Sequence, residues 1–217
     1  MDEPQVIIDL THELRPGVPV FPGSPPATFD PIATIDRDGY AELCLQMGTH
    51  TGTHVDAPCH VLPGARSLDT YPLDAFSGRA VVVDTTGSPQ IELDHLRPLD
   101  GLDLIPDFIL IRTGWDAKWG TPDYFGDFPT LTVEAAERLA SLPIKGVGLD
   151  VASVDSVGAE GLPIHHILMV RDLLIIENLT RLAEIPPGPF EFFCTPLRLR
   201  DADASPVRAY ARINTTA

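Results

Sequence analysis

The chain has 217 residues, a length that fits one domain, 1–217, able to bury a core without disulfides. Its formal net charge of −16 argues against nucleic acid or an anionic membrane as a partner, because phosphate contacts need clustered Lys and Arg. Three cysteines without paired spacing, and a start that lacks the basic and apolar regions of a signal peptide, predict a cytoplasmic protein.

The predicted elements are short and numerous, because 22 prolines and 17 glycines are spread along the chain without a fixed repeat. Short apolar runs rich in β-branched residues have the pattern of strands buried on both faces. These runs are 6–10, 80–84, 108–112 and 173–176. Residues 40–47 and 207–213 alternate between apolar and polar side chains and predict further strands.

Helices are predicted between the strands. A short one lies near 93–96, and a better one covers 133–141, where Thr132 precedes an Ala, Glu and Leu pattern of helical period. Another starts near Pro163, since proline is favoured in a first helical turn, and it carries two adjacent histidines. The predicted fold class is therefore α/β with a mixed sheet.

One segment concentrates metal-binding side chains: His50-Thr-Gly-Thr-His54-Val-Asp56-Ala-Pro-Cys-His60. Imidazole and carboxylate bind ions such as Zn²⁺, Mn²⁺ or Fe²⁺, and a set that leaves coordination positions open suits water activation. An isolated histidine such as His12 is more often a surface residue or a hydrogen-bonded core residue. Clustering weakens that interpretation here, so the segment predicts a metal site with a catalytic base.

The spacing in this segment favours an extended or looped chain over a helix. On a helix His50 and His54 would share a face, but Asp56 would lie about 200° round from His54. In an extended chain the three histidines and Asp56 occupy even positions and can point into one pocket. A straight strand would hold the Cα atoms of His50 and His54 roughly 13 Å apart, so we predict a bend about Gly52.

A second candidate group is Glu177, which directly follows the apolar run 173–176. Burying a carboxylate is costly unless it is paired or bound to a metal. Glu177 at the end of a core strand therefore suggests a charged partner, and simple exposure at the strand end is the alternative.

The motifs and their order resemble the cyclase family of metal-dependent hydrolases, whose members include bacterial kynurenine formamidase and isatin hydrolase. The resemblance covers nearly the full length. It is carried by Asp9-Leu-Thr-His, Phe21-Pro-Gly, the segment 50–60, Gly148-Leu-Asp150, Ser153-Val-Asp155, and His165 to Glu177-Asn-Leu. It implies a compact α/β domain with a mixed or barrel-like sheet and flanking helices, the swivelling β/β/α fold.

Carried over residue by residue, the resemblance implies overlapping metal sites. His50, His54 and Asp56 would bind one divalent ion. Asp56, His165 and Glu177 would complete a second site. The family includes proteins with one ion and with two ions per subunit, and Zn²⁺ and Mn²⁺ are the expected metals.

The resemblance also implies roles for other residues. His60 would be the general acid/base, and Phe21 would line the substrate pocket, at a position where kynurenine formamidases often carry Trp. His165 is preferred to His166 as the ligand because it starts the His-x-x-Leu pattern that family members show. The implied assembly is a homodimer or a homotetramer.

The activity implied is hydrolysis of an aryl or cyclic amide, an N-formylkynurenine-like arylformamide or an isatin-like lactam, by metal-activated water. A cyclase or lactonase acting on a polyketide-like or lactone substrate is the alternative from the same family. A non-catalytic metal-binding protein is a third interpretation. His60 argues against the third, because a binding site has less need of a titratable group beyond its ligands.

Two further groups of residues have open interpretations. Trp115, Asp116 and Trp119 follow a predicted strand and are interpreted as a structured loop or a subunit contact, with a binding role as the alternative. Asp150 and Asp155 match family positions near the site, but carboxylates that follow a strand also cap turns.

Overall fold

The computed structural model describes residues 5–214, and its centre is a nine-stranded mixed sheet. The strand order is β1-β13-β11-β5-β7-β9-β10-β4-β12. The bounds are β1 Gln5–Asp9, β4 His54–Asp56, β5 Ser77–Asp84, β7 Phe108–Arg112, β9 Gly146–Leu149, β10 Leu174–Glu177, β11 Phe190–Phe193, β12 Ala204–Pro206 and β13 Tyr210–Asn214. The strands β5, β7, β9 and β10 are parallel, and the outer pairs are antiparallel. The predicted α/β fold with a mixed sheet is confirmed.

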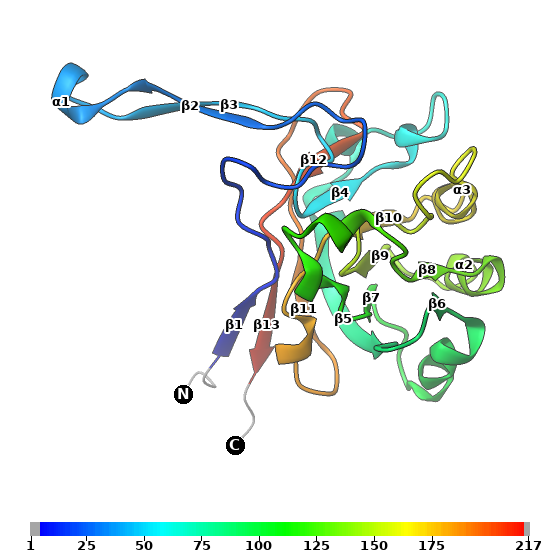
Figure 1. Cartoon of the computed structure of the whole chain (residues 1–217). Helices are drawn as coiled ribbons and strands as arrows, with labels where there is room; N and C mark the ends of the chain where they lie inside the picture. Colours follow the sequence, from blue (N-terminus) through cyan, green and yellow to red (C-terminus); the bar gives the residue numbers. More distant parts are fainter. Residues whose placement is uncertain (1–4, 215–217) are drawn as a thin grey trace.

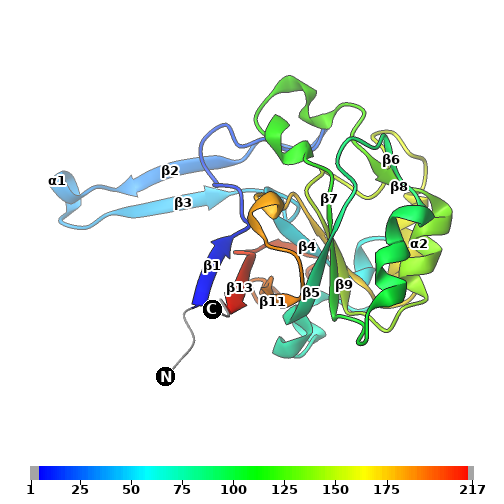
Figure 2. The ribbon, with the colours of Figure 1, turned by 90° about the horizontal axis from the view of Figure 1, so that it is seen from below.

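The central strands separate two apolar clusters, which explains their nearly continuous apolar sequence. On β7, Ile109 and Ile111 pack on the side of the helices, whereas Phe108 and Leu110 pack on the opposite side. The sheet curls, so that β1, β13 and β11 lie across from the helices (Figures 1 and 2). The prediction that 108–112 is buried on both faces is confirmed.

The equivalent prediction for residues 6–10 is wrong along most of β1. Ile7 is 65% exposed and Val6 is 44% exposed. Among the described residues β1 pairs only with β13, at the edge of the sheet, and the exposure of the consecutive residues Val6 and Ile7, which point to opposite faces, shows that neither face is fully covered there. An apolar run alone does not distinguish a central strand from such an edge strand.

The predicted helices are present, with one change of type. Helix α2, Val133–Ala140, begins where the Thr132 side chain accepts a hydrogen bond from the Ala135 backbone N–H at 3.2 Å. Helix α3 covers Pro163–Met169. The segment near 93–96 is part of a 3-10 helix, Leu93–Gly101, rather than an α-helix. No helix within 5–214 combines the length and the apolar composition needed to cross a membrane.

Short elements complete the described chain. A two-stranded pair joins β6 and β8, and further 3-10 helices connect the strands. Their bounds are β6 Gln90–Ile91, β8 Thr130–Leu131, and 3-10 helices at Pro58–His60, Leu68–Thr70, Leu73–Phe76, Trp115–Lys118, Pro122–Phe125 and Leu182–Glu184.

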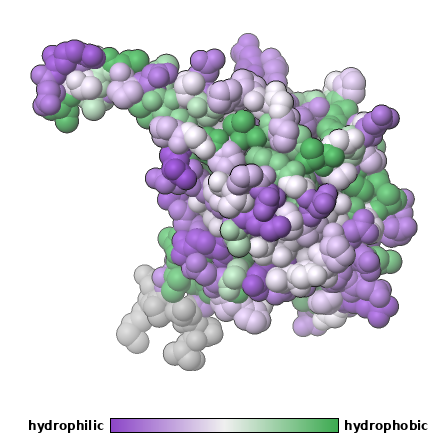
Figure 3. Space-filling model, viewed as in Figure 1, coloured by the Kyte–Doolittle hydropathy of each residue, from purple (hydrophilic) through white to green (hydrophobic). Residues whose placement is uncertain are grey.

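An arm projects from the body of the molecule. It consists of β2, Thr28–Ala33, helix α1, Ile35–Asp38, and β3, Glu42–Gln46 (Figures 1 and 2). The strand predicted over 40–47 is therefore present, but every residue of β3 is exposed. The arm carries apolar side chains at its surface (Figure 3), including Leu43 at 51% exposure. This arm presents apolar surface that no other part of the described chain covers.

Gly146 on β9 tests the packing of the central strands. A Cβ atom at this position would lie 2.7 Å from the Leu174 carbonyl oxygen and 3.2 Å from the Phe108 ring. We expect Gly146→Ala to lower the free energy of unfolding by about 1–3 kcal/mol, because overpacking a closely packed core displaces its neighbours. Urea unfolding measures this effect. Gly101→Ala, which has nothing within 4 Å, is the control, and equal effects of the two substitutions would contradict the prediction.

Candidate active site

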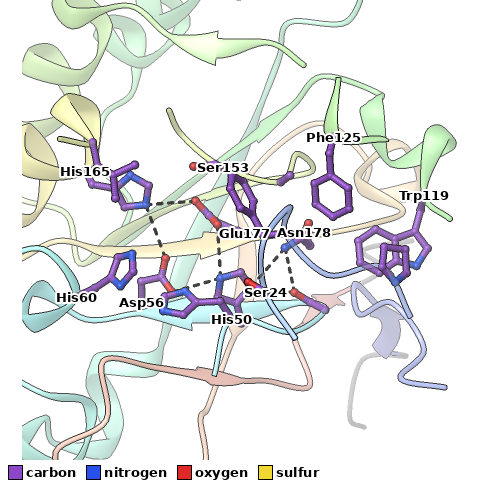
Figure 4. A pocket seen from close by; sticks show the side chains of 16 residues that line it. Ser24, His50, Asp56, His60, Trp119, Phe125, Ser153, His165, Glu177 and Asn178 are labelled. Carbon is purple, nitrogen blue, oxygen red and sulfur yellow. Dashed lines mark hydrogen bonds and ion pairs between the residues drawn. The ribbon is translucent and has the colours of Figure 1, made fainter. Parts of the chain in front are cut away.

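A pocket of about 280 Å³ opens above the ends of β4 and β10. Every site residue predicted from the sequence lines this pocket: Phe21, His50, His54, Asp56, His60, His165 and Glu177. Figure 4 shows the imidazoles and carboxylates at one end of the pocket, and Phe125 and Trp119 at the other. The two ends differ in chemistry, one ionisable and one aromatic.

The bend predicted at Gly52 brings the histidines together. Gly52 has a φ of 67°, a left-handed conformation that favours glycine. Its carbonyl accepts a hydrogen bond from His54 Nδ1 at 2.8 Å, which leaves His54 Nε2 directed at the carboxylates. In the antiparallel pair of β4 and β10, His54 lies opposite Glu177. The segment is therefore bent and then extended, as predicted, before the 3-10 helix that carries His60.

Three groups of side chains are close enough to hold a metal ion: two share Asp56, and the third is His50, His60 and Asp203. In the first, His50, His54 and Asp56 offer ligand atoms within 4.8 Å of one another. In the second, His165 and Glu177 join Asp56 under the same limit. His54 Nε2 lies 3.3 Å from Asp56 Oδ1 and 3.4 Å from Glu177 Oε2, so the two groups adjoin.

Some buried polar atoms in this cluster make no hydrogen bond with the described chain. Asp56 is fully buried, and within the described residues neither of its carboxylate oxygens makes a hydrogen bond of good geometry, although His50 Nδ1 lies 2.8 Å from Oδ1 as an ion-pair partner. His54 Nε2 is also buried and without a partner among them. Burying such groups without partners costs free energy, and a divalent cation between imidazoles and carboxylates removes that cost. The donor set therefore fits a metal such as Zn²⁺ or Mn²⁺.

Asp155 orients His165 for this cluster. Its carboxylate accepts hydrogen bonds from His165 Nδ1 at 2.7 Å and from the backbone N–H groups of Ile164 and His165. His165 Nε2 then faces Glu177 Oε1 at 3.5 Å. Burial lowers the pKa of His165, but the carboxylates of Asp155 and Glu177 outweigh it and raise this pKa to about 10. His166, by contrast, is exposed, so the structure brings His165 and not His166 into the cluster.

Asp150, the other carboxylate left open by the sequence, caps a turn instead. It accepts hydrogen bonds from the backbone N–H and hydroxyl of Thr113 and from the Gly114 N–H, at 2.6 to 3.1 Å. Burial raises its pKa to about 6. It does not line the pocket.

His60 lies beside the cluster, with its ring centroid 4.2 Å from that of His50 and 5.6 Å from that of His165. Burial lowers its pKa more than the carboxylate of Asp56 raises it. This position allows His60 to exchange a proton with a molecule in the pocket while other side chains hold a metal.

Asp203 is a site neighbour that the sequence analysis missed. Its Oδ2 lies 3.0 Å from His50 Nε2 and 3.3 Å from His60 Nδ1. It stands in a run of small and acidic residues, Asp201-Ala-Asp-Ala, which has the composition of a surface loop. Only the pairing of β12 with β4 brings this run to the histidine segment.

Trp119 follows the 3-10 helix Trp115–Lys118 in a loop, as predicted, and its side chain lines the pocket with Phe21 and Phe125, which favours the alternative of a binding role. The His12 ring stacks on Trp119, with centroids 4.0 Å apart and planes 8° apart. Trp115 keeps a loop role, since its Nε1–H donates to the Tyr124 carbonyl at 2.8 Å. Of the aromatic end of the pocket, Phe21 was expected from the family resemblance, whereas Trp119 and Phe125 come from a distant segment of the chain that no local pattern connects with it.

The buried side chain of His12 makes the free energy of unfolding depend on pH. It is 8% exposed, Nε2 has no partner within 5–214, and burial lowers its pKa to about 4. The unfolded chain therefore binds this proton more readily, so stability is complete above pH 6.5 and falls as the pH drops toward 4. Over this pH range His12 should cost the wild type about 3 kcal/mol of its free energy of unfolding. We expect His12→Phe, which keeps a ring on Trp119, not to show this fall.

Urea unfolding of the wild type and of His12→Phe between pH 7.5 and 4.5 would measure the difference. His166→Gln, at an exposed position, is the control. A free-energy difference between wild type and His12→Phe that stays constant over this range would contradict the prediction.

Comparison with known proteins places this site in a family. The Cyclase family model matches residues 8–156. A kynurenine formamidase from Paracidovorax citrulli is 35% identical over 98% of this chain and 99% of its own length, and one from Salinibacter ruber is 34% identical over 95% and 97%. Isatin hydrolase A from Labrenzia aggregata superimposes with a TM-score of 0.86 at 27% identity, covering 97% of this chain and 94% of that one. The chain belongs to the Cyclase family.

Proposed function

We propose that this protein is a metal-dependent hydrolase that cleaves an aryl or cyclic amide. The observation that carries the proposal is the fully buried carboxylate of Asp56, which lies among imidazoles without a hydrogen bond of good geometry within the described chain, at the ionisable end of a pocket whose other end is aromatic. The similarity to kynurenine formamidases and to an isatin hydrolase supports an N-formylkynurenine-like arylformamide or an isatin-like lactam as the substrate.

In this proposal the metal ligands are those of the two adjoining groups. His50, His54 and Asp56 hold one divalent ion, and Asp56, His165 and Glu177 hold a second where two are bound. The ion is Zn²⁺ or Mn²⁺. Such an ion supplies Lewis acidity, which lowers the pKa of water and polarises an amide carbonyl.

The protein side chains supply the rest of the chemistry. His60 is the general acid/base: it accepts a proton as water attacks the carbonyl and donates it to the nitrogen as the C–N bond breaks. Phe21, Trp119 and Phe125 contact the aryl ring and hold the amide toward the ionisable end. No serine or cysteine nucleophile is needed for this reaction.

A second candidate function uses the same residues. A solved structure described as a potential metal-dependent hydrolase with cyclase activity aligns with a TM-score of 0.82 at 29% identity. That similarity favours a cyclase or lactonase as the alternative. Product analysis separates the two, because hydrolysis of an N-formyl aryl amine releases formate and a cyclisation does not.

Removing and restoring the metal tests the proposed function. We expect chelator-treated protein to lose turnover of N-formylkynurenine, isatin or a compound from a small lactone panel, and to regain it with Zn²⁺ or Mn²⁺. Full activity in metal-free protein would contradict metal dependence. Stoichiometric metal without turnover of any of these compounds would contradict the proposed substrate class.

The role of His60 is tested by His60→Gln. We expect kcat to fall by about 10²–10⁴, the range for loss of a general acid/base, while the metal content of the protein stays unchanged. His166→Gln, a substitution on the exposed face of α3, should leave both unchanged. Loss of metal from His60→Gln would instead make His60 a ligand.

We also propose that the chain forms one domain, 1–217, and acts on a small molecule in the cytoplasm. Its proposed assembly is a homodimer or a homotetramer. The arm supports the assembly. A two-stranded hairpin alone is marginally stable in water, and Ile32, Leu43 and Leu45 on the arm are 52%, 51% and 49% exposed. A second copy of the chain would cover these side chains, and the arm runs between Ser24 and His50, which both line the pocket.

Leu43→Asp on the arm tests this assembly. A charge at an apolar subunit contact is buried at a cost, so we expect the sedimentation coefficient of the variant to fall to that of a smaller species. Leu73→Asp, at a position 72% exposed outside the arm, is the matched control. A wild type that sediments as a monomer, or a Leu43→Asp variant that assembles as the wild type does, would contradict the arm as the contact.

A further inference from the structure

Asp203 is anchored beside the histidine segment by its backbone. Its carbonyl accepts a hydrogen bond from the Ala57 N–H at 2.8 Å, next to Asp56. The neighbouring strand β12 then pairs with β4 through Ala204, which lies opposite Asp56. The position of the Asp203 side chain is therefore set by the same sheet edge that carries the proposed ligands.

The carboxylate of Asp203 contacts three side chains. Oδ1 accepts a hydrogen bond from the Thr49 hydroxyl at 3.1 Å. Oδ2 lies 3.0 Å from His50 Nε2 and 3.3 Å from His60 Nδ1. A single oxygen thus touches both a proposed metal ligand and the proposed general acid/base.

These contacts specify which ring nitrogens carry hydrogen. A carboxylate oxygen only accepts, so His50 Nε2 and His60 Nδ1 must donate to it. His50 Nδ1 faces Asp56 Oδ1 at 2.8 Å, so without a metal it carries a proton as well, and it is the nitrogen that would bind an ion once that proton is lost. His60 is left with Nε2 as the nitrogen that can accept a proton.

His50, His60 and Asp203 also lie close enough to hold an ion themselves, so two roles for Asp203 must be compared. The Asp203 oxygens already have hydrogen-bond partners, and its side chain is 40% exposed. Asp56 is fully buried, and its oxygens have ion-pair contacts with His50 and His54 but no hydrogen bond of good geometry within 5–214. Metal-binding histidines commonly donate their second ring N–H to a carboxylate, which matches Asp203 and not Asp56.

From this geometry we infer that Asp203 is a positioning residue, which holds His50 in the orientation of a metal ligand and His60 in the tautomer of a proton acceptor. This inference rests on the proposed function for its effect on turnover. Its effect on the His60 tautomer is independent of that function.

The test compares Asp203→Asn with Asp201→Asn, a nearby exposed aspartate in a left-handed conformation that asparagine tolerates. The amide introduced by Asp203→Asn cannot accept from Thr49 and also from both imidazoles, because one of its two positions is an NH₂ donor. We expect kcat of Asp203→Asn to fall about 10–100-fold, with KM within about twofold and the metal content retained, as for other partners of metal-binding histidines. Asp201→Asn should behave as the wild type.

Nitrogen-15 NMR of the imidazole rings in metal-free protein is the second measurement. We expect the wild type to show His60 protonated at Nδ1, and Asp203→Asn to lose that single tautomer. Thr49→Val, which keeps the carboxylate, should keep the His60 tautomer and show a smaller fall in kcat. If Asp203→Asn does not fold, the wild-type spectrum still tests the inference, because a His60 ring that is not protonated at Nδ1 would contradict it.

Three results would overturn the inference. One is a kcat of Asp203→Asn equal to that of Asp201→Asn, and another is an unchanged His60 tautomer. The third is complete loss of metal from Asp203→Asn in excess metal, beyond the 10–100-fold weakening that a positioning residue causes, which would make Asp203 a ligand. If the wild type hydrolyses none of the assayed amides, the proposed substrate class fails, and the NMR spectra still decide the role of Asp203.

Discussion

The Asp56 carboxylate is the constraint on which the site depends. It is fully buried, makes no hydrogen bond of good geometry with residues 5–214, and has ion-pair contacts with His50 at 2.8 Å, His54 at 3.3 Å and His165 at 3.9 Å. An ionised carboxylate in such a place is stable only beside positive charge. Protonated imidazoles supply some of that charge in the metal-free chain, and a divalent cation would supply it with better geometry. The same carboxylate belongs to both candidate ligand groups, so it links them into one centre.

The pairing of β4 with β10 places Asp56 and His54 beside Glu177. Strand β10 lies between β9, which is parallel to it, and the short antiparallel strand β4. The apolar residues of β10 are covered on both faces, so Glu177 at its end is held rigidly beside His54. The ligands come from distant parts of the sequence, but the sheet register fixes their separation.

Much of this site could be predicted from the sequence because its signals are local. Three histidines and Asp56 lie within one short segment, and Gly52 marks the bend that gathers them. Glu177 could be inferred because a carboxylate directly after a core strand needs a charged partner. The overall fold class followed from the apolar runs of the central strands, and similarity to a known family supplied the choice of His165.

The remaining features depend on contacts that local patterns do not encode. Residues 6–10 have the composition of a buried strand, but burial depends on neighbours, and β1 is at an edge. Trp119 reaches the pocket because its loop folds back onto His12, and Asp203 reaches His60 through the pairing of β12 with β4. The contacts of Trp119 and Asp203 join segments that are far apart in the sequence, and neither segment has a pattern that indicates the other.

The central claim is that the buried Asp56 carboxylate is stabilised by a bound metal ion. The most direct test is the thermal unfolding of chelator-treated wild type and of Asp56→Asn, each with and without stoichiometric Zn²⁺ or Mn²⁺. The account predicts a clear rise in Tm of the wild type on adding metal, because a ligand that binds the folded state stabilises it. It predicts no such rise for Asp56→Asn. Equal Tm values for the wild type with and without metal, or an equal rise in both proteins, would contradict it.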